Sequence, residues 1–412
     1  MACNKRTRAL SIIMSLFMLV GCGISKPETE SSEAGTNDAA EQYSDHSDGT
    51  EETVSDDELW EEAISLIEKR KYPQAISVLS KIEEDDRADD LLQQLRYIIS
   101  GDYIQNLLSG VAAIDNEGKV IIRDIYEANG YERVQEWTDI KRISYVFEGL
   151  DALSSEGAFF TTLDDEEYSG QLGEAVRQRN EQLGRISGIS ILATDTSNYA
   201  VTDQSGKLYL YNEYNGYLET ESNRKEIESW SDIVDIVTGD LRVAVLHKDG
   251  TVSFVDRSKP PNQTFVEYSV YFNDMKEWTD IVDISGADGG SIAGLRADGT
   301  VLVSHRMLGE TPGENYLEVS KWTDIIAISK SSRNILGLKS DGTVVTAGLV
   351  NEGQKGVAEW TDIVAISAGQ DFHVGLKSDG TLVVAGERQG DRPLPDVSDV
   401  KNLYVPKINL NE

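Results

Sequence analysis

Few residues of this sequence have the type and spacing that catalysis or metal binding requires. No Gly-x-Ser-x-Gly, phosphate-loop or Rossmann glycine pattern occurs. The run Asp164-Asp165-Glu166-Glu167 could hold Ca²⁺, but such a run more often forms a solvated acidic loop. The four histidines show no metal-ligand spacing: His46, His247, His305 and His373. We therefore expect no catalytic site, no metal and no cofactor.

The two cysteines, Cys3 and Cys22, both lie within the first 22 residues, so the rest of the chain has no thiol chemistry. Basic residues near the start precede a short apolar stretch, residues 11–20. This stretch is too short to span a bilayer comfortably, which favours a signal peptide over a permanent transmembrane helix. We expect residues 1–21 to be that signal peptide.

The end of this segment, Leu19-Val20-Gly21-Cys22, resembles the bacterial lipoprotein signal. The resemblance implies cleavage before Cys22 and attachment of a lipid, with palmitate, to its sulfur. It implies an extracytoplasmic protein that is lipid-anchored to the bacterial cell membrane. The alternative is an ordinary secretory signal in which the cysteine stands by chance.

Residues 22–57 are rich in Glu, Ser, Asp, Thr and Gly and have almost no large apolar residue. Such a segment cannot bury enough surface to offset its ordering entropy, so we expect a disordered acidic tether. The formal net charge of the 412-residue chain is −34. A polyanion of this size repels phosphate backbones, so we expect no nucleic-acid partner.

Apolar residues recur at helical spacing over residues 58–100. Ala63 and Ala75, with Tyr72 before the second of them, resemble a tetratricopeptide repeat, in which small residues let two helices pack closely. A plain helical hairpin is the alternative. One such unit rarely stands alone, so we expect it to dock on the segment that follows.

A repeated unit fills residues 101–412. Its clearest copy runs from Trp360-Thr361-Asp362-Ile363 to the turn Ser378-Asp379-Gly380. Further copies begin at Trp137, Trp230, Trp278 and Trp322, and counting back from Gly206 places a copy without tryptophan at Ile186. Each unit has strands joined by a tight turn, with Val364 and Ile366 expected on one strand face and Ala365 and Ser367 on the other.

Six full units are joined by two halves. Residues 111–124 carry only the hairpin half, and 397–404 only the opening half, with Val397 in the tryptophan place. We expect a mainly β fold: a seven-bladed β-propeller closed by both ends of the chain, with strands from about Tyr103 to Val405. Closure removes exposed strand edges.

The unit W-[ST]-D-I-V-x-I-S…G-L-K-S-D-G-T-V-V resembles the regulator of chromosome condensation repeat, and Gly348–Gln354 echoes the bacterial form of it. The resemblance implies a seven-bladed propeller, but it does not fix an activity. A secreted bacterial relative inhibits β-lactamase through a loop face, which by analogy suggests protein binding.

The repeat residues are assigned to the scaffold. The tryptophans are expected to pack, and the motif aspartates, such as Asp362, to hold a turn by accepting backbone N–H groups. The segments between units differ in length and carry tyrosines that we expect on one rim as a binding surface: Tyr126, Tyr131, Tyr211, Tyr214, Tyr217, Tyr268, Tyr271 and Tyr316.

These features predict a membrane-anchored protein-interaction scaffold whose partner is another protein or an envelope component, and not an enzyme. A hydrolase or glycan-binding protein acting on cell-wall or extracellular polymer is the alternative. A third possibility is a purely structural part of an envelope assembly, with the helical hairpin as the partner site.

Overall fold

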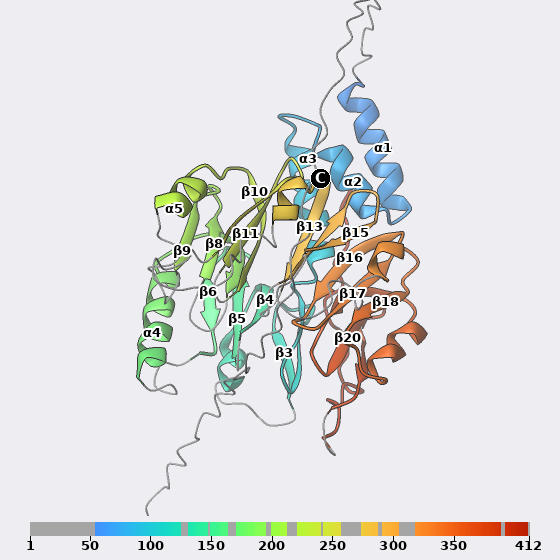
Figure 1. Ribbon diagram of the computed structural model, residues 1–412. Coiled ribbons are helices and arrows are strands. Elements are labelled where there is room, and N and C mark those ends of the chain that lie inside the picture. The colour runs from blue at the N-terminus through green and yellow to red at the C-terminus, as the bar shows by residue number, and fades with distance from the viewer. Residues whose placement is uncertain are drawn as a thin grey trace, which may run out of the picture. The chain divides into compact units, whose positions relative to one another are not determined.

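The computed structural model describes residues 54–124, 131–146, 149–163, 170–194, 199–211, 221–239, 242–256, 273–286, 291–304, 318–388 and 392–410. They form N-terminal helices followed by seven antiparallel sheets of three strands each (Figure 1). The predicted signal peptide, Cys22 and almost all of the predicted tether lie outside the described residues.

Three helices open the described chain: α1 (Asp56–Glu68), α2 (Tyr72–Leu79) and α3 (Asp86–Ser100). Ser55 and Glu58 form a capping box, which explains why α1 begins here. The apolar stripes of the three helices share one hydrophobic core with β13 and β16, and Figure 1 shows α1–α3 in blue beside these orange strands. The expected docking of the helices on the sheets is therefore confirmed.

The seven sheets follow one another along the chain, each with its strands in sequential order. Their strands are β1 (Ile104–Asn106), β2 (Gly110–Ile114), β3 (Val120–Asp124); β4 (Ile140–Val146), β5 (Gly149–Ser154), β6 (Phe159–Thr161); β7 (Ile189–Thr194), β8 (Tyr199–Asp203), β9 (Leu208–Tyr211); β10 (Ile233–Gly239), β11 (Arg242–His247), β12 (Val252–Asp256); β13 (Ile281–Gly286), β14 (Ile292–Arg296), β15 (Val301–Val303); β16 (Ile325–Lys330), β17 (Asn334–Lys339), β18 (Val344–Gly348); β19 (Ile363–Ser367), β20 (Phe372–Lys377), β21 (Leu382–Gly386).

The sheets are arranged in a closed ring. The first strand of every sheet contacts the first strand of the next sheet, from β1 through β4, β7, β10, β13 and β16 to β19. The ring is completed because β19 also contacts β1. The described chain is thus a seven-bladed β-propeller, and its first strands line the centre.

Both ends of the chain build the inner strand of the first sheet. Ile114 in β2 donates its N–H to the carbonyl of Tyr103 (3.0 Å), and its own carbonyl accepts the N–H of Tyr404 (2.9 Å). Asp115 forms a β-bridge with Leu403. Closure by both chain ends is therefore confirmed, and the N-terminal end contributes β1 as well as the predicted hairpin.

The predicted alignment of the closing segment is wrong by three residues. Leu403 donates to the glycine carbonyl of the preceding hairpin turn, as Ile363 does in its own unit. Val400 therefore stands where Trp360 stands, and its N–H bonds the carbonyl of Val397 as in the tryptophan copies. Val397 and Val400 fit the sequence pattern equally well. The backbone conformation at Asn402 shows that Val400 takes the tryptophan position.

That conformation also corrects the role given to the motif aspartates. Asp362 has φ 60° and Asn402 has φ 59°, the left-handed region that these residue types tolerate best after glycine. Asp362 uses its backbone carbonyl, which accepts the N–H of Ser378 at 2.9 Å. Its carboxylate is bonded by the hydroxyl of Thr361 at 3.2 Å and by no backbone N–H, contrary to the prediction.

Simple alternation along the first strands is also wrong. Their pairing shifts by one residue near the start of six sheets, for example between Ile363 and Ala365. This bulge puts Val364 and Ala365 against the same cluster as Tyr103, whereas Ile366 packs on the opposite side.

The motif tryptophans pack on the middle strands, as predicted. The Trp360 ring lies over Gly375, where an added Cβ would come within 2.9 Å of the ring. Trp322 covers Gly337 and Trp278 covers Gly294 in the same way. The chain reaches most tryptophans through a short 3₁₀ helix: η1 (Tyr131–Glu136), η4 (Asn273–Glu277), η5 (Val319–Lys321) and η6 (Gln354–Glu359).

Two helices interrupt the region where only strands were predicted: α4 (Gln171–Leu183) and α5 (Glu221–Glu228), the green helices of Figure 1. The ion pair of Arg179 with Asp151 ties α4 to β5, and both side chains are fully buried. The copy at Ile186 is confirmed, because the N–H of Ile189 bonds the carbonyl of Gly157 as in the other units.

Closure of the ring generates a stability prediction. Leu403 is 2% exposed and Leu410, in the same tail, is 40% exposed. Leu403→Ala should lower the free energy of unfolding by about 2–4 kcal/mol through the buried cavity it leaves. Urea denaturation measures this, and Leu410→Ala, the matched control, should change it by under about 0.5 kcal/mol. Equal effects of the two variants would contradict closure through Leu403.

Candidate functional site

Charged side chains gather where α3 meets the first strands of the ring. They come from one position of the repeat, three residues after the motif aspartate, which is alanine in the last two units, at Ala327 and Ala365. The corresponding residues of earlier units are Arg142, Asp235 and Asp283. We call these three residues, with Arg96 and Asp102, the inner charge cluster.

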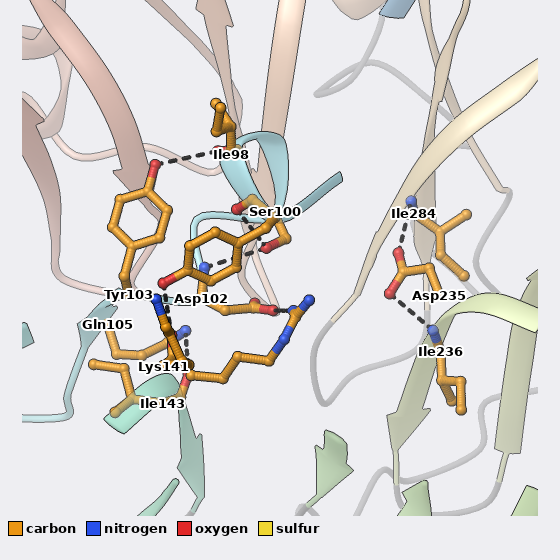
Figure 2. A network of polar contacts seen from close by, with 12 residues as sticks. Ile98, Ser100, Asp102, Tyr103, Gln105, Lys141, Ile143, Asp235, Ile236 and Ile284 are labelled. Atoms are coloured by element: carbon orange, nitrogen blue, oxygen red, sulfur yellow. Dashed lines mark hydrogen bonds and ion pairs between the residues drawn. The ribbon is translucent and has the colours of Figure 1, made fainter. Parts of the chain in front are cut away.

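One side of the cluster is an ion pair between Asp102, just after α3, and Arg142 in β4. The Arg142 guanidinium also lies 5.3 Å from the ring centroid of Tyr97, whose hydroxyl donates to the carbonyl of Lys141 at 2.7 Å. Figure 2 shows Asp102 beside Tyr103, whose hydroxyl donates to the carbonyl of Ile98 at 3.2 Å. This side ties the end of α3 to the first and second sheets.

On the other side Asp235 bridges two sheets. Its carboxylate accepts the N–H of Ile236 in its own strand (2.8 Å) and of Ile284 in β13 (3.3 Å), as Figure 2 shows. The side chain is half-buried, yet the protein around it raises the pKa of Asp235 to about 7. Burial is the largest cause, and the negative charge of Asp102 adds to it.

Asp283 lies close to Asp235 in the next sheet and is 6% exposed. Burial raises its pKa well above the ordinary value, and the neighbouring charge of Asp235 raises it further. Arg96 reaches down from α3 and donates to the carbonyl of Val282 at 3.0 Å. Burial lowers the pKa of Arg96, while the two aspartates act in the opposite direction.

The cluster could exchange a proton near neutral pH, but its described neighbours do not complete a catalytic centre. Across the described residues no group of three or more His, Cys, Asp or Glu side chains could hold a metal ion. The bonds of Asp235 and Arg96 go to backbone groups of the inner strands. We therefore interpret the cluster as the polar contact between α3 and the ring.

Only two of the tyrosines expected on the binding rim are described. Tyr211 does not present an exposed ring: it is 8% exposed, stacks on Tyr199 at 5.8 Å between ring centroids, and donates its hydroxyl to Gln178 in α4 at 3.0 Å. Tyr131 is half-buried against the core of the first two sheets. The others lie outside the described residues: Tyr126, Tyr214, Tyr217, Tyr268, Tyr271 and Tyr316.

The described histidines have structural surroundings. His373 is fully buried, and burial lowers its pKa to about 3. His247 places its ring nitrogens 2.7 Å from the carbonyl of Ser231 and 2.8 Å from the hydroxyl of Ser253. His46, His305 and the acidic run 164–167 lie outside the described residues.

Sequence reasoning missed the inner charge cluster, although a signal was present. Charged residues replace alanine at one fixed position of the repeat, and a closed ring brings such positions together at its centre. The sequence gives no comparable signal for Arg96, because the position of a residue in α3 does not indicate which strand of the ring it contacts.

No protein-family model and no curated protein matches this chain. Among solved structures, the CRINKLY WD40 ectodomain of the Arabidopsis thaliana receptor kinase ACR4 is similar at TM-score 0.42 and 11% identity, over 72% of this chain and 97% of that one. Prp20p of Saccharomyces cerevisiae, described with its binding to Gsp1p and histones, gives TM-score 0.33 and 17% identity over 55% and 65%. The seven-bladed ring is established by its own strand contacts.

No helix within the described ranges is long and apolar enough to cross a bilayer.

The raised pKa of Asp235 predicts a pH dependence of stability. The folded protein holds a proton that the unfolded chain releases between about pH 4 and pH 7, so the free energy of unfolding should fall as the pH rises through this window. Asp235→Asn should flatten the slope and, at pH 8, stabilise the protein by on the order of 2 kcal/mol. Urea denaturation between pH 4 and pH 8 measures both effects.

Asp379→Asn is the matched control. Bonds from the hydroxyl and N–H of Thr381 lower the pKa of Asp379, so its loss should not stabilise the protein at pH 8. An unchanged slope in Asp235→Asn would contradict protonation at this site.

Proposed function

We propose that this protein is an extracytoplasmic lipoprotein whose propeller, built from repeats of the regulator of chromosome condensation type, is a protein-interaction scaffold. The observation that carries this proposal is the closed ring. Its repeat residues pack against one another and form the hydrogen bonds between sheets, so they are not free to bind a partner. What remains for recognition is the outer surface and the uneven segments between sheets.

The two faces of the ring differ. Side chains of α3 bond the carbonyls of Lys141 and Val282, and Arg70, in the turn between α1 and α2, bonds that of Ile363. All three carbonyls lie at the starts of first strands. First and third strands of a three-stranded antiparallel sheet run in the same direction, so third strands end at the opposite face. We call that face the loop face, because the segments that join the sheets leave from it.

The loop face suits a protein partner for two reasons. The segments that leave it vary in length and carry most of the tyrosines listed above, a residue type enriched where proteins recognise one another. The face opposite is already occupied near its centre by α2 and α3. An acidic chain with net charge −34 favours a basic or neutral partner.

Site-specific cross-linking tests the loop face. A photoreactive amino acid in place of Tyr214 or Tyr217 should give a discrete protein adduct in intact cells, identified by mass spectrometry. The same amino acid at Asp298, an exposed turn residue at the helix-side end of the fifth sheet, is the control and should give none. Adducts at Asp298 alone would move the partner to the helix side and contradict the proposal.

Lipidation is tested separately. Cys22→Ala should abolish labelling by a palmitate analogue and release the protein from the membrane fraction, because no other cysteine follows the signal segment. Cys3→Ala, which changes the only other cysteine, should leave label and fractionation unchanged. Label retained in Cys22→Ala would contradict lipid attachment at Cys22.

A further inference from the structure

A cavity of about 300 Å³ lies where the turn between α1 and α2, the end of α3, strand β19 and the C-terminal tail meet. Its polar lining consists of Arg70, Tyr72, Tyr103 and Lys407, and its remaining walls are aliphatic side chains from α3, β19 and the tail. None of the described residues that line it carries a carboxylate. In a chain of net charge −34, a cavity with two cations and no acid is unusual in its chemistry.

The cations of this cavity are available for a ligand. Among the described residues the Arg70 side chain makes one hydrogen bond, from Nη2 to the carbonyl of Ile363 at 3.3 Å, and the guanidinium has further donors. No acidic side chain in the described ranges pairs with Arg70 or with the exposed Lys407. Arg70 also belongs to Lys69-Arg70-Lys71, the sequence's one run of three consecutive basic residues.

The backbone at Arg70 gives an independent reason to assign a role to its side chain. Arg70 follows the C-terminus of α1 with φ 55°, a left-handed conformation that ends helices and usually falls to glycine. The N–H groups of Arg70 and Lys71 bond the carbonyls of Ile67 and Leu66, both at 2.9 Å. Glycine would fit this backbone with less strain, so an arginine is kept here at a local conformational cost.

We propose that this cavity binds a small organic anion: a carboxylate carried on an apolar or aromatic body. Arg70 and Lys407 provide charge-assisted donors for the carboxylate. The two tyrosine rings and the aliphatic walls bury the body. The volume is at the lower end of the range that small-molecule sites occupy, which excludes a folded partner from the cavity. The site lies on the helix side and is independent of the proposed loop face.

Calorimetric titration of the full-length chain tests the proposal, with benzoate as the probe. Benzamide is its neutral counterpart, and inorganic phosphate supplies negative charge without an apolar body. Benzoate should bind at least about tenfold more tightly than either, since one charge-assisted contact is worth about 1.4 kcal/mol or more.

Arg70→Gly removes the side chain while favouring the backbone conformation, so it should remain folded and bind benzoate about tenfold more weakly. Lys407→Gln, at an exposed residue, should weaken binding about threefold. Lys401→Gln, at an exposed tail lysine that does not line the cavity, should leave it unchanged.

Three results would overturn the proposal: benzamide or phosphate binding as tightly as benzoate, benzoate affinity unaffected by both Arg70→Gly and Lys407→Gln, or no benzoate binding at millimolar concentration. Because Lys407→Gln does not disturb the helix contact, it decides the matter if Arg70→Gly fails to fold.

Discussion

The ring depends on the contact between an indole ring and a residue without a side chain. Trp278, Trp322 and Trp360 each cover a glycine of the middle strand so closely that a Cβ would have to displace the ring. Other units depart from this pair in different ways. Ile186 shares its cluster with Val201. Where glycine lies under the ring the tryptophan is buried, whereas Trp230, in the cluster with Val245, is only half-buried.

The centre of the ring follows a second constraint. Inner strands have an unpaired edge, and their N–H groups need acceptors. In the later sheets repeat serines provide them: Ser329 accepts the N–H of Ala368 at 2.9 Å, and Ser367 that of Asn106 at 2.8 Å. In the fourth sheet valine replaces the serine, at Val237, and Asp235 accepts from the next strand instead. The half-buried Asp235 is thus a local substitute for a neutral acceptor.

The sequence pattern predicted the number of units, the copy that lacks tryptophan and closure by both chain ends, because these depend on residue types at fixed spacing. It did not predict the alignment at Val400, because valines at two positions satisfy the same hydrophobic pattern. It did not predict α4 either, whose buried Arg179 pairs with Asp151, 28 residues earlier in the sequence. The cavity at Arg70 could not be predicted either, because its lining comes from the helices, strand β19 and the C-terminal tail, which are distant in sequence.

The strand shared by the two chain ends has a consequence for how the protein comes to be folded. Asn116 and Asn402, bonded across it, are 286 residues apart in sequence. During synthesis the first sheet can form its hairpin early, but its inner edge stays open until Leu403 and Tyr404 have been made. Contacts this distant in sequence slow folding, so the first sheet to be translated is the last to be finished.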